Sequence, residues 1–413
     1  MNEAYLKDVN DLLEDLGKNL DISKTHYEQA VKSYEAVGNY LSNPESNLAV
    51  YQPEILPQGS FLLGTVVKPI CDSDDIDVDL VCQLKRKPLN WTQRNLKDAI
   101  GNRLKQSSRY GEMIKEKQGG RRCWTLHYAD DANYHMDILP ALAEHDLQIF
   151  LNERFSQNTI SDFERGEIRI TDNQSPNYGW DTDYLNWHKS NPFGYARWFY
   201  TKSIIESKRL FSLNESIEPI KEYTEKKSPL QRVVQLLKRH RDIMFSDNEL
   251  DSEDRPISII ITTLAARAYA DNKTANISQA FFDIAKRLRN YINEIQDDKG
   301  RTIKYVPNPV NRAENFADKW PGVEQKEEYF YLWLDKLEKD VDDLRYGGGK
   351  GHSNLNESFS KMFGDKVSRK TFADYGNSKR ILREEGKRRM AFGSGLLGST
   401  GEKIKNHNFY GKD

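Results

Sequence analysis

The chain has 413 residues, of which 30% are charged and 37% are apolar, the mixture of an ordinary globular protein large enough for two packed lobes. Its formal net charge of −2 excludes the overall positive field typical of proteins that coat nucleic acids. Three scattered cysteines, Cys71, Cys82 and Cys123, exclude a disulfide framework and a CxxC metal motif. Because no segment has the pattern of a signal peptide or a membrane span, we expect a cytoplasmic protein with no membrane partner.

Apolar residues at helical spacing dominate the beginning of the chain. Leu6, Val9 and Leu13 start a series that is interrupted near residues 21–23 and then resumes. We therefore expect one or two long helices that act as an N-terminal spine over residues 1–45.

The next part of the chain, residues 46–190, predicts an α/β lobe with a small mixed sheet. Its sequence IDVDLVCQL alternates in polarity and then becomes continuously apolar, which is typical of a strand buried on one or both faces. The expected elements are a short helix at residues 61–65, a strand at 76–84, a helix at 91–106, strands at 121–128 and 134–142, and a turn at 130–133.

Residues 191–344 predict a second lobe that is helical. A Ser-Pro pair caps one helix, PLQRVVQLLKRHRDIMF, and PISIIITTLAARAYA reads as a buried helix, although its β-branched run also fits a strand. Amphipathic helices are expected at residues 277–295 and 327–344. Residues 345–413 are rich in Gly, Lys and Ser, and we expect a flexible C-terminal tail there.

A candidate phosphate site lies in the first part of the α/β lobe. Gln58, Gly59 and Ser60 lie where a turn opens a short helix. Backbone N–H groups at such a turn, together with a serine hydroxyl, suit the oxygens of a phosphate.

Three acidic residues form the candidate catalytic and metal site. Asp77 and Asp79 alternate along one strand, so their carboxylates leave the same face and repel one another unless a cation lies between them. Asp137 lies on another strand among apolar residues, where a carboxylate needs a partner. Carboxylate oxygens suit Mg²⁺ or Mn²⁺, and three of them predict a two-metal site. Asp75 also stands two residues before Asp77, and is the reserve candidate.

These motifs together resemble those of the polymerase-β-type nucleotidyltransferases. More narrowly, the chain resembles the bacterial cGAS/DncV-like nucleotidyltransferases (CD-NTases, SMODS-type) of the CBASS anti-phage systems. The resemblance rests on GSFLLGT, DVDLV and MDI in the first lobe, and on SNPFGYARWF, PLQRVVQLLKRHRD, RPISIIITTLA and NPVNRAENFADKW in the second.

The resemblance implies a fold and a set of residue roles. The implied fold is α+β, with a polymerase-β-like lobe built on a small mixed sheet and an all-helical lobe of the oligoadenylate-synthase type. The roles carried over are phosphate or nucleotide binding for Gln58, Gly59, Ser60, Lys238, Arg239 and Ser258, and metal binding with catalysis for Asp77, Asp79 and Asp137.

The implied activity is the condensation of nucleoside triphosphates, ATP or GTP, into a cyclic di- or trinucleotide. This product would be a second messenger for an effector in anti-phage defence, made with Mg²⁺ or Mn²⁺ and with release of pyrophosphate. Family members of this kind also imply a conjugating enzyme that acts on a C-terminal glycine. Here Gly411 is followed by Lys412 and Asp413, so the tail departs from that pattern.

Three other functions fit part of the sequence. A transferase that makes linear oligonucleotides or modifies RNA ends would use the same acids, but the near-neutral charge argues against an extended RNA site. A transferase that modifies a protein or tRNA would not need so large a helical lobe. A silent binding protein would not need the acids.

Overall fold

The computed structural model describes residues 3–385, 387, 389–390, 397–398 and 402–403, apart from gaps at 72–74, 115–118, 129–133, 145–165, 206–222, 247–249 and 348–350. The predicted turn at 130–133 and the end of the tail therefore lie outside the described residues. Within the described part of the chain, no helix combines the length and the apolarity that a membrane span requires.

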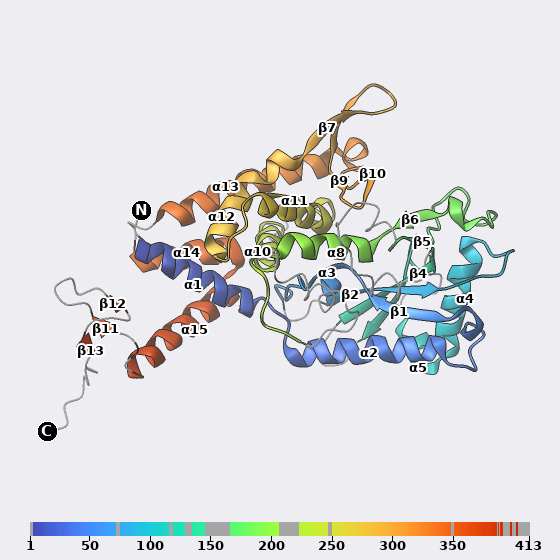
Figure 1. Cartoon of the computed structure of the whole chain (residues 1–413), viewed down its shortest axis with the longest axis horizontal. Coiled ribbons are helices and arrows are strands. Elements are labelled where there is room, and N and C mark those ends of the chain that lie inside the picture. Colours follow the sequence, from blue (N-terminus) through green and yellow to red (C-terminus); the bar gives the residue numbers. More distant parts are fainter. Residues whose placement is uncertain are drawn as a thin grey trace.

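The first lobe is built on a six-stranded mixed sheet (Figure 1). Its order is β1-β2-β4-β5-β6, with β3 paired to β4, and the central pair β2·β4 is parallel while the other pairs are antiparallel. The strands are β1 Pro53–Pro57, β2 Ile76–Leu84, β3 Trp124–Tyr128, β4 Tyr134–Ala143, β5 Ile168–Ile170 and β6 His188–Ser190. Helices α3 Gly59–Leu63, α4 Gln93–Gln106 and α5 Ser108–Met113 complete the lobe. The mixed sheet predicted from the sequence is thus confirmed.

The N-terminal spine consists of two helices, α1 Glu3–Asn19 and α2 Lys24–Ser42. The break lies where the apolar series is interrupted, and the Ser23 side chain caps α2 by accepting from the His26 N–H. Figure 1 shows α1 among the helices of the second lobe and α2 along the sheet lobe. Since α1 packs in one hydrophobic core and α2 in the other, the spine links the two lobes.

The second lobe is a set of packed helices around a large apolar core. Its helices are α8 Pro192–Ser203, α10 Pro229–Met244, α11 Ser258–Asp271, α12 Ile277–Arg287, α13 Glu324–Tyr346, α14 Gly351–Phe363 and α15 Asp365–Glu384. The β-branched segment at α11 is a helix because nearly all of its faces are buried, so helix packing decides its structure in place of β-propensity.

The expectation of a flexible tail from residue 345 is wrong for residues 351–384. Leu355, Phe359 and Phe363 recur at helical spacing and are buried in the core of the second lobe. Lys379 on α15 pairs with Asp11 on α1 at 2.7 Å. The Gly-, Lys- and Ser-rich composition hid this apolar stripe, which belongs to two ordered helices. Short pairings at β11 Arg389–Met390, β12 Leu397–Gly398 and β13 Glu402–Lys403 follow them.

The helix expected at residues 277–295 is also too long. Helix α12 ends at Arg287, and β7 Asn293–Gln296 pairs with β8 Thr302–Tyr305. A second small sheet joins β9 Pro307–Asn308 to β10 Asn311–Asn315. The sequence did not predict these four strands, because their exposed and polar residues carry no clear alternation. In the part of the chain that the structure describes, the helical lobe therefore also holds the short hairpins β7–β8 and β9–β10 (Figure 1).

Candidate active site

The pairing of β2 with β4 brings the predicted acidic residues together. In the parallel register Asp79 lies opposite Asp137, and Asp77 lies opposite His135. Register partners and residues two apart on a strand share one face of a sheet, so all four side chains leave the same face. Asp77 is exposed, whereas Asp79 and Asp137 are half-buried.

Gly59 fits tightly against this face at the start of α3. Its φ of +58° lies in the left-handed region, and a Cβ there would overlap with Oδ2 of Asp79. The N–H of Gln58 donates to the backbone oxygen of Asp79 at 2.8 Å. The predicted Gln58-Gly59-Ser60 turn therefore lies directly beside the predicted acids.

Asp79 and Asp77 differ in their electrostatic surroundings. Burial raises the pKa of Asp79 to about 6, and the negative charges of Asp77 and Asp137 add to that rise. The pKa of Asp77 is lowered, chiefly by a hydrogen bond with His135, whose Nε2 lies 2.6 Å from Oδ1 of Asp77. The same contact raises the pKa of His135 to about 9. A protonated imidazole thus supplies one positive charge to the acidic face.

Asp137 has a partner of its own. The hydroxyl of Thr125, its register neighbour on β3, donates to Asp137 Oδ1. Within the described ranges, no three His, Cys, Asp or Glu side chains are arranged as a formed metal-binding group. The donor set nevertheless fits a hard divalent cation, because three carboxylates share one face, and because burial and then the charges of Asp77 and Asp137 raise the pKa of Asp79, whose ionised form such a cation would favour.

Lys238 reaches this region from the second lobe. Its Nζ donates to the backbone oxygen of Thr65 at 3.2 Å, in the loop that follows α3. Burial lowers the pKa of Lys238 to about 8, the charge of Arg241 adds to the decrease, and Asp79 opposes it. Lys238 therefore lies within electrostatic range of the acids, as a contact to a bound triphosphate requires.

Arg239, the next residue on α10, lies elsewhere. It is 4% exposed, and its Nη2 donates to the backbone oxygens of Lys68 and Pro69. Together with residues at the start of α15 it lines a separate cavity of about 190 Å³. Successive helix residues point about 100° apart, so the structure does not place Arg239 with Lys238 beside the acids.

Ser258 begins α11 and already has a partner. Its Oγ accepts from Nη1 of Arg241 at 2.9 Å. Arg255, three residues earlier, is exposed, and its charge contributes to the lowered pKa of Asp77. Arg255 is not among the site residues predicted from the sequence, although it directly precedes the PISIII motif.

A cavity of about 300 Å³ extends from the acidic face into the second lobe. Gln58, Gly59 and Asp79 line one part of it, and Asn308, Glu314 and Phe316 from the β9–β10 segment line another. These last three residues are not among the site residues predicted from the sequence, because no local pattern connects a short hairpin with strand β2. His135 and Thr125 were missed as well, although His135 lies two residues before Asp137 and thus on the same strand face.

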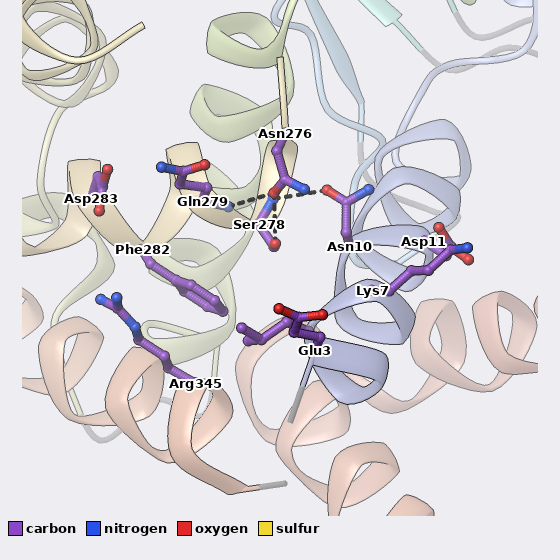
Figure 2. A pocket seen from close by; sticks show the side chains of 11 residues that line it. Glu3, Lys7, Asn10, Asp11, Asn276, Ser278, Gln279, Phe282, Asp283 and Arg345 are labelled. Atoms are coloured by element: carbon purple, nitrogen blue, oxygen red, sulfur yellow. Dashed lines mark hydrogen bonds between the residues drawn. The ribbon is translucent and has the colours of Figure 1, made fainter. Parts of the chain in front are cut away.

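A second cavity, of about 490 Å³, lies between α1, α12 and α13 (Figure 2). Its wall includes the contact of the Ser278 N–H with Oδ1 of Asn10, at 3.2 Å. Phe282 and Arg345 face it from the other helices. Since it includes none of the predicted site residues, it is not the candidate active site.

Comparison with known proteins places this geometry in context. The SMODS family, described as the Second Messenger Oligonucleotide or Dinucleotide Synthetase domain, matches residues 8–163. A c-di-GMP synthase of Roseivirga ehrenbergii is 29% identical over 343 residues, which cover 83% of this chain and 81% of that protein. The cyclic dinucleotide synthase CdnG of Bradyrhizobium diazoefficiens is 22% identical over 383 residues, 89% of this chain and 83% of that protein.

A solved structure is also similar to this chain. It is the CD-NTase CdnG from Bradyrhizobium diazoefficiens in complex with GTP, and it matches with a TM-score of 0.62 at 21% identity, over 89% of this chain and 99% of that chain. The structural likeness shows the fold.

Proposed function

We propose that this chain is one of the cGAS/DncV-like nucleotidyltransferases, the CD-NTases, and that it condenses nucleoside triphosphates into a cyclic dinucleotide. One observation carries the proposal: Asp79 and Asp137 are register partners on one face of the sheet, Gly59 lies against Asp79, and Asp79 lines a cavity. A ribose hydroxyl attacks the α-phosphate of a triphosphate, pyrophosphate leaves, and a second transfer closes the ring.

The groups around the acids suggest which residues would bind the phosphates of the substrate. The backbone N–H groups of Gly59 and Ser60 and the ammonium of Lys238 would hold phosphate oxygens, since Gly59 lies against Asp79 and Lys238 contacts Thr65 just after α3. Arg255 would add a further positive charge near Asp77, besides those of His135 and Lys238. These groups would orient the α-phosphate toward the acids and stabilise the charge of the leaving pyrophosphate.

We propose that Asp77, Asp79 and Asp137 hold Mg²⁺ or Mn²⁺. When bound, such ions lower the pKa of the attacking hydroxyl and neutralise phosphate charge. His135 and Thr125 would keep Asp77 and Asp137 positioned on the same face. Burial and the negative charges of Asp77 and Asp137 raise the pKa of Asp79. A bound cation would therefore favour the ionised form of Asp79 more than that of the other two acids.

The biological role proposed for the product is that of a second messenger in anti-phage defence, read by a separate effector. The support is the match to the SMODS family and the activity named for the relatives in Roseivirga and Bradyrhizobium. The rival activities, synthesis of linear oligonucleotides or transfer to RNA ends, a protein or a tRNA, would use the same acids. They differ in the product, which is therefore the property to measure.

The decisive experiment identifies the product. The purified protein is incubated with all four nucleoside triphosphates and Mg²⁺ or Mn²⁺, treated with phosphatase, and analysed by mass spectrometry. We expect a phosphatase-resistant cyclic dinucleotide. Products that are only linear and phosphatase-sensitive would contradict ring closure and favour the linear rival.

A matched pair of variants tests the site. Asp79→Asn keeps the shape of the side chain but removes its charge, and it should lower product formation by at least about 100-fold, because the positioned carboxylate is lost. Asp98→Asn, an exposed acid on α4, is the control and should retain activity. Equal activity in the two variants would show that the acidic face is not catalytic.

A further inference from the structure

The β9–β10 segment places a carboxylate at the edge of the cavity that begins at the catalytic strand. Glu314 lines this cavity of about 300 Å³ together with Asn308 and Phe316, while Asp79 and Gly59 line it from the sheet lobe. Figure 1 shows β9 and β10 near the beginning of α8, where Asn191 and Tyr195 also line the cavity. A molecule that fills this cavity is therefore bordered by Asp79 at one part and by Glu314 at another.

The cavity has the size and the walls that a nucleobase needs. Its volume lies at the lower end of the range of small-ligand pockets, about 300 to 1,000 Å³. Phe316 and Tyr195 form an aromatic pair with ring centroids 6.2 Å apart, and both line the cavity. Flat apolar walls of this kind contact the face of any base and do not distinguish one base from another.

Glu314 is oriented by a buried neighbour. Nδ2 of Asn308 donates to Oε2 of Glu314 at 2.7 Å. Asn308 is 5% exposed, and its own Oδ1 accepts from the Val310 N–H at 3.0 Å. Because both ends of its amide are hydrogen-bonded, Asn308 holds the Glu314 carboxylate in one orientation. An ionised carboxylate has about four acceptor positions, so Glu314 can still accept hydrogen bonds from a ligand.

Only one base presents the hydrogen-bonding edge that such a carboxylate favours. An ionised carboxylate accepts hydrogen bonds and donates none. Guanine presents two adjacent donors, N1–H and the 2-amino group. Adenine and cytosine each place a ring-nitrogen acceptor beside their amino group, and uracil flanks its N–H with two carbonyl oxygens. An acceptor facing the second carboxylate oxygen is repelled.

We propose that Glu314 is the residue that selects guanine, and hence that GTP is a preferred substrate of this enzyme. Asn308 acts as a positioning residue for Glu314. The inference rests on the proposed function, since it concerns the base of the triphosphate on which the acids act. Base choice then depends on the hydrogen bonds of the Glu314 carboxylate and not on the shape of the cavity.

The variant Glu314→Gln tests the inference, because a glutamine amide has the complementary pattern for adenine. Its oxygen accepts from the adenine amino group and its NH₂ donates to N1, whereas the same NH₂ opposes a donor of guanine. We expect kcat/KM for GTP to fall by about 10- to 100-fold relative to ATP. Glu294→Gln on β7, an exposed glutamate paired with Lys304, is the control and should leave the ratio unchanged.

Inosine triphosphate isolates the contact further, because it keeps N1–H and lacks the 2-amino group. The unsubstituted enzyme should use it several-fold less well than GTP, and this difference should disappear in Glu314→Gln. An unchanged GTP-to-ATP ratio, or an unchanged GTP-to-inosine ratio, in Glu314→Gln would overturn the role of Glu314.

The outcomes separate this inference from the proposed function. An unsubstituted enzyme that makes cyclic products but prefers ATP or a pyrimidine nucleotide overturns the inference and leaves the proposed function standing. If no nucleotidyl transfer occurs with any triphosphate, the proposed function fails, and calorimetric binding of GTP and ATP decides the inference instead. Tighter binding of GTP that Glu314→Gln abolishes supports it, and equal binding overturns it.

Discussion

At the scale of single residues, Gly59 is the point where backbone conformation and the acidic face meet. Its positive φ and its contact with the Asp79 carboxylate are two separate reasons for the absence of a side chain. The sequence indicated a phosphate-holding Gly-Ser turn here, and the structure adds the reason that the first residue must be glycine. A larger residue would displace the carboxylate that the chemistry needs.

We predict that Gly59→Ala lowers product formation by at least about 10-fold. The added methyl group would push the Asp79 carboxylate away from its position, and catalysis depends on that position. The strain at a positive φ should also lower the free energy of unfolding by about 1–2 kcal/mol. Activity assays and urea unfolding measure the two effects. Gly322→Ala is the control, since a Cβ there meets no atom within 4 Å. Full activity in Gly59→Ala would mean that Asp79 is free to move.

At the scale of elements, α14 and α15 change the description of the second lobe. They pack against α10 and α1 and complete the apolar core that α10 to α13 begin. Phe359 of α14 is fully buried and meets Phe363 and Phe372 edge-on, with ring centroids 5.6 and 5.5 Å apart. Residues that composition assigned to a tail therefore hold part of the helical lobe together.

We predict that Phe359→Ala lowers the free energy of unfolding by about 3–5 kcal/mol, because it removes a buried aromatic ring and leaves a cavity. Chemical denaturation followed by circular dichroism measures the change. The matched control is Ile381→Ala on α15, whose side chain is 46% exposed and should cost less than about 1 kcal/mol. A similar, small change in both variants would restore the view of residues 351–384 as a loosely attached segment.

At the scale of the whole molecule, each lobe contains a buried carboxylate whose pKa lies well below its ordinary range. Burial alone would raise the pKa of Asp172 in the first lobe, but hydrogen bonds from Arg121 and Arg122 outweigh it. Burial would also raise the pKa of Asp340 in the second lobe, but hydrogen bonds from His240 and Lys336 lower it by more. Trp333 donates to Nδ1 of His240, so Nε2 of that ring carries the proton donated to Asp340.

We predict that the free energy of unfolding decreases as the pH falls below about 4. Both acids have folded-state pKa values below the unfolded value of 3.8, so the unfolded chain takes up protons first. The stabilisation that the two acids contribute is complete above the unfolded-state pKa of 3.8, and it is lost as the pH falls toward their folded-state pKa values. Urea unfolding at pH 7, 5, 4, 3 and 2 measures the slope. Asp340→Asn should be less stable at pH 7 and show a shallower slope below pH 4. An unchanged slope would mean that Asp340 does not contribute to it.

The sequence by itself determined the local features of this protein. The alternation of Asp77 and Asp79, the Gly-Ser turn before α3 and the break between the first two helices are readable because strand period, turn chemistry and helix caps act over a few residues. The resemblance to the CD-NTases added the family, which the comparisons support. The roles assigned to single residues remain predictions.

Only the tertiary structure decided which distant residues meet. The parallel register sets Asp137 opposite Asp79, and the packing of α10 turns Lys238 toward the acids while Arg239 faces Lys68. Glu314 lies 235 residues from Asp79 in the chain, and no local pattern connects them. The physical reason is that contacts between elements depend on how their apolar faces pack together, and this is a property of the whole core rather than of any single segment.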